Sequence, residues 1–247
     1  YIITDNVIFD SLRVDPGTTI RINDQKSIGI TSYLDCSGKK DSMIVFTNNK
    51  GYWKNIKNLG EESMSVSYCV FENASPGYPD NLLSEISIYD CIIKHNKNQL
   101  FWHIRDPIKI ERTVFYENQA GADKMIHNFH SKLLKNNNFC NNTSYNTFPI
   151  LNASPLEYDQ IHSKIIDNAF INNSSRQKMR DIAFNTNYGN DFSINKLSPN
   201  YFGNKDSINI EKRIFDYYED SKYPVWIGYD SSQARPSSKN HGLSWKI

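Results

Sequence analysis

Short runs of alternating apolar and polar residues recur along the chain and break at Asn or Gly. SVSYCVF, at 65–71, alternates before two apolar residues in a row. A period of two is typical of a strand with one buried face. LRVDPGTTIRIN, at 12–23, places two such runs around Asp15-Pro16-Gly17, a strong turn signal. These patterns predict short strands joined by turns.

One run repeats at a fixed interval. SYCVFENAS (67–75) matches YDCIIKHNK (89–97) at an offset of 22 residues, with Cys69 over Cys91. Similar runs follow from Thr113, Asn138, Ala169 and Asn200, and earlier copies lie at 19–23 and 44–49. One coil of three short strands and three turns needs about 20 to 25 residues, so the repeat predicts a solenoid. In it, an Asn at a bend can bond to the Asn of the next coil.

The repeat also predicts which residues stack. Residues 7–204 are expected to form parallel strands that lie about 4.8 Å apart in successive coils. The corresponding positions are predicted to be Val70, Ile92, Val114, Phe139, Phe170 and Tyr201.

Composition supports strands and excludes some partners. Asn is the commonest residue, with 30 copies, and Asn favours turns over helix interiors. The 28 basic and 27 acidic residues form no basic block, which argues against nucleic acid as a partner. No apolar run reaches the roughly 18 residues of a membrane span, so membrane insertion is not expected. The start at Tyr1, without a signal-peptide pattern, indicates a processed or excised piece of a longer protein.

The four cysteines lack the spacing of a metal site. Buried free thiols are the favoured interpretation. Cys69 and Cys91 are expected to stack directly, so a disulfide between them stays open as an alternative. Cys36 and Cys140 are expected to lie remote from that pair.

Three stretches carry a family resemblance. They are LRVDPGTTIRI, GYWKNI (51–56) followed by SVSYCVFENA, and the segment from NYFGN to IGY (200–229). They resemble the right-handed parallel β-helix (pectate-lyase-like) superfamily of bacterial exported proteins. The resemblance implies an all-β, single-stranded parallel β-helix at an extracellular or cell-surface location. It leaves activity open, because the superfamily includes pectin-type lyases, polysaccharide hydrolases, phage spikes and inactive surface modules.

The C-terminal part predicts an end to the solenoid. Ser207 can cap a short helix in which Ile210, Ile214 and Tyr217 share one face and cover the open end. Residues 1–229 are therefore expected to form the β-helix domain with its C-terminal helical cap. Residues 230–247 are expected to be a linker and the start of a following domain, so other domains of the same polypeptide are expected partners.

The best candidate binding cluster is FWHIRDP, at 101–107. Trp102 and Arg105 could stack on a sugar and bond to it, His103 could act as a base, and Asp106 lies beside them. The plainer interpretation is a surface loop with an Arg105–Asp106 charge pairing. Tyrosines in turns could extend a stacking surface for a polysaccharide, namely Tyr52, Tyr78, Tyr116, Tyr145 and Tyr158.

Signatures of catalysis and of metal binding are weak. No Asp-Asp pair occurs, and the aspartates of the first coils fall mostly at turns, which disfavours a calcium site. His127 and His130 have a spacing of three but no evident third ligand. The sequence therefore predicts no metal, no cofactor and a non-catalytic extracellular module that binds glycan weakly. A β-helix polysaccharide lyase or glycoside hydrolase, and a purely structural spacer or adhesin stalk, remain alternatives.

Overall fold

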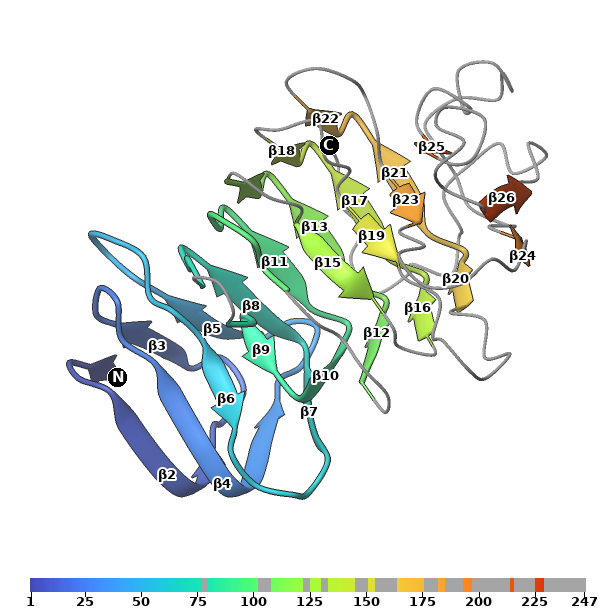
Figure 1. Ribbon diagram of the computed structural model, residues 1–247. Helices are drawn as coiled ribbons and strands as arrows, with labels where there is room; N and C mark the ends of the chain where they lie inside the picture. Colours follow the sequence, from blue (N-terminus) through green and yellow to red (C-terminus); the bar gives the residue numbers. More distant parts are fainter. Residues whose placement is uncertain are drawn as a thin grey trace.

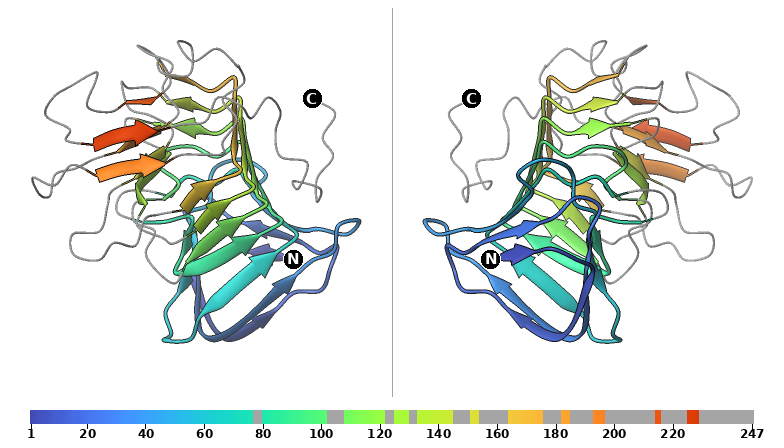
Figure 2. Two further views of the ribbon diagram at one scale, coloured as in Figure 1. Left: turned by 90° about the vertical axis from the view of Figure 1, so that its right-hand side faces the viewer. Right: turned by 90° about the vertical axis from the view of Figure 1, so that its left-hand side faces the viewer.

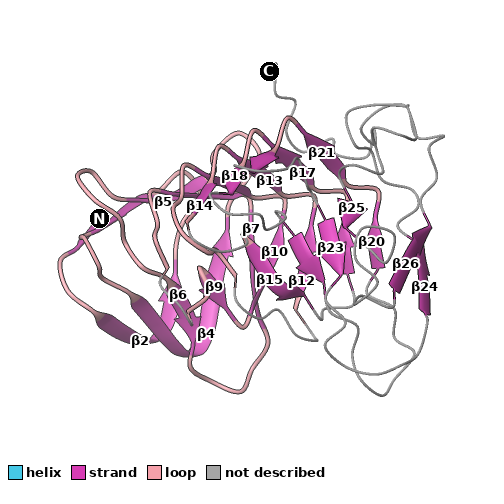
Figure 3. Cartoon of the chain, turned by 45° about the horizontal axis from the view of Figure 1, so that its top comes forward, coloured by secondary structure: helices cyan, strands magenta, loops and turns pink. Residues whose placement is uncertain are grey.

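The computed structural model is a parallel β-solenoid (Figure 1). It describes residues 1–76, 80–101, 108–121, 125–129, 133–144, 151–153, 164–175, 182–184, 193–196, 214–215 and 225–228. Every pair of named strands in these ranges is parallel, and none of these residues lies in a helix (Figure 3). No membrane-spanning helix is therefore found in the part of the chain that the structure describes.

The strands are short, and most have two to four residues. Their bounds are β1 Ile2–Ile3, β2 Val7–Arg13, β3 Thr19–Ile22, β4 Ile28–Ser37, β5 Ile44–Thr47, β6 Ile56–Asn58, β7 Met64–Ser67, β8 Cys69–Glu72, β9 Leu83–Ser84, β10 Ile86–Tyr89, β11 Ile92–Lys94, β12 Lys109–Glu111, β13 Val114–Tyr116, β14 Gln119–Ala120, β15 Ile126–Phe129, β16 Leu133–Lys135, β17 Asn138–Cys140, β18 Thr143–Ser144, β19 Leu151–Ala153, β20 Lys164–Ile166, β21 Ala169–Ile171, β22 Ser174–Ser175, β23 Ile182–Phe184, β24 Ser193–Lys196, β25 Ile214–Phe215 and β26 Val225–Gly228.

The chain visits three faces in turn. Face 1 is the sheet β1-β3-β5-β8-β11-β13-β17-β21, and face 2 runs β20-β16-β12-β10-β7 to the second half of β4. Face 3 begins with the first half of β4, β6 and β9, and a bridge from Phe101 to Ile126 leads on to β15-β19-β23-β25. The ten-residue β4 thus turns the corner between faces 3 and 2, because Ile28–Ile30 pair with β6 and Cys36–Ser37 pair with β7. Figure 2 shows the faces around a common interior.

The interior is filled by apolar side chains that occupy the same position in each successive coil. On face 1 the inward row is Ile20, Phe46, Phe71, Ile93, Phe115, Phe139 and Phe170. Neighbouring rings lie parallel where two Phe meet, with Phe115 and Phe139 centroids 4.5 Å apart and Phe139 and Phe170 4.9 Å apart. Such repetition lets each coil bury its apolar face only against its neighbours.

Two left-handed residues bracket each middle strand of face 1. They turn the chain sharply at both edges of the face, and positive φ is uncommon outside Gly. The pairs are five positions apart, namely Tyr68 and Asn73, Asp90 and His95, Arg112 and Glu117, Asn136 and Asn141, and Asp167 and Asn172.

The residue after each of these corners is buried and bonds between coils. Asn118 is typical, because its backbone N–H and its Nδ2 both donate to Oδ1 of Asn142, at 3.1 and 3.0 Å. Its Nδ2 also donates to the carbonyl of Ile93 at 2.8 Å. One such ladder runs through Ala74, Asn96, Asn118, Asn142 and Asn173, and the other through Cys69, Cys91, Thr113, Asn137 and Asn168.

These pairings confirm the predicted parallel stacking and the bonding of Asn between coils, with one correction of register. Ile92 lies beside both Val70 and Val114, and Phe139 lies beside Phe170, as predicted. Val114, however, pairs with Asn138 rather than Phe139. The predicted match was wrong by one residue because Asn137, not Asn138, occupies the ladder position of Thr113. Tyr201 lies outside the described residues.

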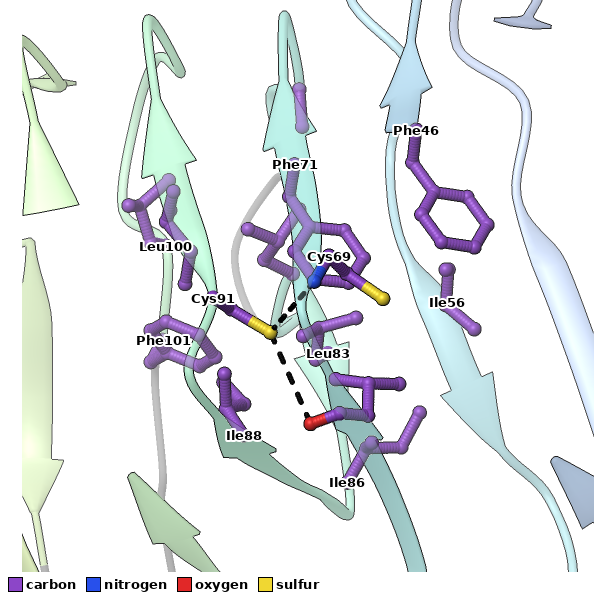
Figure 4. Close-up of a cluster of buried hydrophobic side chains, with 14 of the residues drawn as sticks. Phe46, Ile56, Cys69, Phe71, Leu83, Ile86, Ile88, Cys91, Leu100 and Phe101 are labelled. Carbon is purple, nitrogen blue, oxygen red and sulfur yellow. Dashed lines mark hydrogen bonds between the residues drawn. The ribbon is translucent and has the colours of Figure 1, made fainter. Parts of the chain in front are cut away.

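The cysteines confirm one stacking prediction and correct another. The N–H of Cys69 donates to Sγ of Cys91 at 3.4 Å, so the two are stacked (Figure 4). Cys36 is not remote, because its carbonyl accepts from the Cys69 thiol at 3.3 Å. Cys140 lies on β17, three strands from β8 in face 1. All four are free and buried.

Of the predicted cap, the structure describes Ile214 and Phe215. They form β25, which pairs with β23 through Ile182 and Ala183. Ser207, Ile210, Tyr217 and the segment 230–247 lie outside the described residues, so the cap helix and the domain boundary stay predictions.

Replacing Asn118 with Ala should test the ladder. The change leaves the Asn96 N–H and the Ile93 carbonyl without their bonds to the Asn118 side chain, and each buried group left unpaired costs about 1–3 kcal/mol. We expect a loss of about 3 kcal/mol in the free energy of unfolding, measured by denaturant titration. Asn49→Ala is the matched control, since Asn49 is exposed and should cost less than about 0.5 kcal/mol. Equal losses in the two variants would contradict this role.

Thiol labelling should report burial at all four cysteines. Burial raises the pKa of Cys36 to about 12 and that of Cys140 to about 11, and the hydrogen bond with Cys91 raises the pKa of Cys69. Near pH 8 the native thiols should therefore react slowly with a thiolate-specific reagent, while denatured, unreduced protein should show four free groups. A Lys40→Cys variant, altered at an exposed loop, should gain one fast-reacting group. Two free groups after denaturation would instead reveal a disulfide.

Candidate functional site

A groove of about 380 Å³ lies on the outer side of face 2. Its floor follows from strand alternation: in β7 and β10, Met64, Val66, Ile86 and Ile88 are buried in the core, and the residues between them point outward. The 22-residue offset between coils aligns residues of the same type, because Ser65 pairs with Ser87. The groove is lined by Asn58, Gly60, Glu61, Glu62, Ser63, Met64, Ser65, Glu85, Ser87, Tyr89, Ile108 and Lys109.

One wall is the turn between β6 and β7. Asn58 shapes it, because its Nδ2 donates to the Glu62 carbonyl at 2.7 Å and its Oδ1 accepts the Gly60 N–H at 2.9 Å. Gly60 itself lies against the Thr31 backbone, where a Cβ atom would come within 1.9 Å of the carbonyl oxygen. Only glycine fits there, so the turn that carries Glu61 is held in one place.

The Tyr89 end of the groove is fixed by an ion pair. Arg112 binds Asp90 with two hydrogen bonds, from Nε at 2.8 Å and Nη2 at 2.7 Å, and contacts Glu111 at 3.3 Å. Its guanidinium carbon lies 6.0 Å from the centre of the Tyr89 ring. The hydrogen bond to Asp90 raises the pKa of Arg112. Two hydrogen bonds to one carboxylate fix the orientation of the Arg112 guanidinium as well as its position. The Tyr89 ring therefore packs against a side chain that is held in place.

The lining offers polar groups of several kinds. Carboxylates come from Glu61, Glu62 and Glu85, the cation from Lys109, and hydroxyls from three serines and Tyr89. Ser87 Oγ accepts the Lys109 N–H at 3.1 Å, which leaves its hydroxyl proton free to donate. In the described residues no group of three or more His, Cys, Asp or Glu could hold a metal ion, so the three glutamates of the groove do not form a metal site among these residues. The arrangement is suited to hydrogen bonding with a polyol beside an aromatic ring.

A second polar cluster lies on the corner that follows face 1. His95 Nε2 lies 3.1 Å from Oε2 of Glu117, and the His95 ring meets Tyr116 edge-on at 6.2 Å. A hydrogen bond from Tyr116, followed by that from His95, lowers the pKa of Glu117. The same bond with Glu117 raises the pKa of Tyr116. These groups satisfy one another on an exposed surface.

The predicted cluster Trp102, His103, Arg105 and Asp106 lies outside the described residues. The first residues described after it, Ile108 and Lys109, line the groove. His127 lies on β15, and His130 lies outside the described residues.

The predicted tyrosine surface is only partly described. Tyr52 lies under Lys97, with Nζ 4.6 Å from the ring centre, and Tyr116 joins the His95 cluster. Tyr78, Tyr145 and Tyr158 lie outside the described residues.

Sequence reasoning missed Tyr89 and the three glutamates of the groove. A signal existed, because the 22-residue offset aligns Ser65, Ser87 and Lys109 on one outward row and Ser67, Tyr89 and Glu111 on the next. The wall of glutamates had no such signal, since its place depends on how the turn folds over face 2.

Comparisons with protein-family models, with curated proteins and with solved structures found no match for this chain. Function therefore has to follow from the fold and from the residues of the groove.

Replacing Arg112 with Ala should weaken the Tyr89 end of the groove. Asp90, whose side chain is 10% exposed, would lose its cation. Because the Arg112 side chain is 35% exposed and the pair is partly screened by water, we expect a loss of only about 1–2 kcal/mol in the free energy of unfolding. Arg21→Ala is the control, since Arg21 is exposed and its guanidinium bonds to one Asn side chain. No difference between the two would show that the pair adds nothing to stability.

Proposed function

We propose that the chain is a non-catalytic module that binds an extended polysaccharide along the face 2 groove. The observation that supports this most directly is the outward row of polar side chains, repeated coil by coil, beside the Tyr89 ring. Sugars are bound by stacking on aromatic rings and by dense hydrogen bonding. A straight row on a solenoid suits a polymer better than a small ligand.

The charge of the lining narrows the class of glycan. Three carboxylates face the groove against one ammonium group. A polyuronate would bring its own carboxylates next to Glu61, Glu62 and Glu85, which repulsion disfavours. The groove is therefore proposed to bind a neutral or amine-bearing glycan.

The wider setting belongs to the same proposal. The solenoid is proposed to wind right-handedly, as in the pectate-lyase-like superfamily, and to be part of a larger bacterial exported or surface protein. The stretches that resemble that superfamily support this, together with the parallel coils.

A glycan-array screen followed by titration tests the function. Tyr89→Ala should weaken binding of any neutral or amino glycan found by fivefold or more, because a lost stacking contact costs about 1 kcal/mol. Tyr33→Ala, at an exposed ring outside the groove lining, should leave the affinity unchanged. An assay for reducing ends and unsaturated products should stay negative. Absence of binding by the unaltered protein, or cleavage of the glycan, would refute the proposal.

A further inference from the structure

The floor of the groove is a straight row of side chains. Ser65 of β7 pairs with Ser87 of β10, and Lys109 of β12 follows at the same register, because Ile88 pairs with Ile110. The Lys109 N–H donates to Ser87 Oγ at 3.1 Å, so these two residues are direct neighbours. Such a row crosses the strands. It therefore runs parallel to the axis of the solenoid and advances by about 4.8 Å per coil.

The two sides of this row differ in chemistry. Along the chain Glu85 precedes Ser87 and Tyr89 follows it, and all three line the groove. Asn58 joins the carboxylate side, because its Nδ2 donates to the carbonyls of Glu62 at 2.7 Å and Glu85 at 3.4 Å. A ligand that lies on the row therefore has carboxylates along one side and an aromatic ring along the other.

The groove covers only a short part of this row. In the preceding coil the row continues with Asp35, whose carboxylate lies 3.6 Å from Nε of Arg13. In the following coil it continues with Leu133, which pairs with Lys109. Neither Asp35 nor Leu133 lines the groove, whose floor thus takes one residue from each of three successive coils.

A straight row with a regular step discriminates between glycans by the geometry of their linkages. In a β-1,4-linked chain of glucose-type sugars both bridging bonds of each ring are equatorial. The chain is then a flat, extended ribbon, and each ring advances it by nearly one coil step. In an α-1,4-linked chain one bridging bond is axial, so the chain curves into a helix and leaves the row. Only the ribbon can present hydroxyl groups to Ser65, Ser87 and Lys109 together.

We propose that the groove selects extended β-1,4-linked glycans, which lie parallel to the solenoid axis with one ring on each of the three coils. This inference rests on the proposed polysaccharide binding and adds the linkage, the direction and the length of the bound segment. The carboxylate side accepts chains of glucose and of glucosamine alike, since neither sugar brings a negative charge to Glu62 and Glu85.

Calorimetric titration of the full chain with defined oligosaccharides tests the linkage. The probes are β-1,4-linked oligomers of glucose and of glucosamine, from two to six rings, and the α-1,4-linked hexamer of glucose. At least one β-linked series should bind. The α-linked hexamer should bind at least about tenfold more weakly, because it loses the hydrogen bonds of two coils. Affinity should rise steeply up to the third ring. Further rings should add only the statistical gain from extra binding frames.

A variant of the floor tests the position of the bound segment. Ser87→Ala should weaken binding of the β-linked trisaccharide about fivefold, because the central coil loses its hydroxyl group. Ser37→Ala is the matched control, since Ser37 is an exposed serine of β4 that does not line the groove. It should leave the affinity unchanged. Circular dichroism checks that both variants are folded.

The outcomes separate this inference from the proposed function. Equal affinity for the α-linked hexamer, a steep rise that continues beyond the third ring, or full affinity in Ser87→Ala would overturn the linkage proposal and leave polysaccharide binding standing. Failure of both β-linked series while another glycan binds would do the same. Failure of every glycan to bind would overturn both.

Discussion

The structure depends on one repeated arrangement: a left-handed corner followed by a buried side chain that bonds to the next coil. Each sharp bend brings backbone N–H groups inside, where a strand ladder cannot pair them. Asn118 shows the pattern. Its Oδ1 accepts from the backbone N–H and the side-chain amide of Asn96 in the preceding coil. Its Nδ2 donates to the Ile93 carbonyl of that same coil and to Oδ1 of Asn142 in the following coil. Buried polar groups are tolerated when every donor and acceptor is used in this way. The ladder thus makes a tight corner compatible with a dry interior.

The ladder that begins at Cys69 shows that side chains other than Asn can fill these positions. It begins with thiols at Cys69 and Cys91, continues with the hydroxyl of Thr113, and ends with Asn137 and Asn168. Sulfur is a weak acceptor, so the thiol part relies more on packing than on hydrogen bonds. The change from Cys to Asn along the chain coincides with coils that grow longer, with 24 residues between the ladder partners Thr113 and Asn137 and 31 between Asn137 and Asn168.

The sequence predicted the parallel solenoid because its period of apolar pairs repeats the core row directly. It placed the register correctly from Val70 to Val114 and failed at the run Asn136-Asn137-Asn138. Three identical residues there take three different roles: left-handed corner, buried ladder rung and outward strand position. Apolar periodicity cannot separate these roles, because only hydrogen bonding distinguishes them. The groove was harder to predict from the sequence than the register. Tyr89 belongs to an outward row that the repeat reveals, but Glu61 lies at the groove only because of the turn held by Asn58 and Gly60.

Fold and surface are connected through the same corners. A solenoid fills its interior, so recognition has to use either its lateral faces or its ends. On the lateral face, the left-handed residues Asp90 and Arg112 of successive coils point outward, bind each other and steady Tyr89 at the edge of the groove. The corners that solve the internal hydrogen-bonding problem therefore also decide which side chains are rigid enough on the surface to bind something.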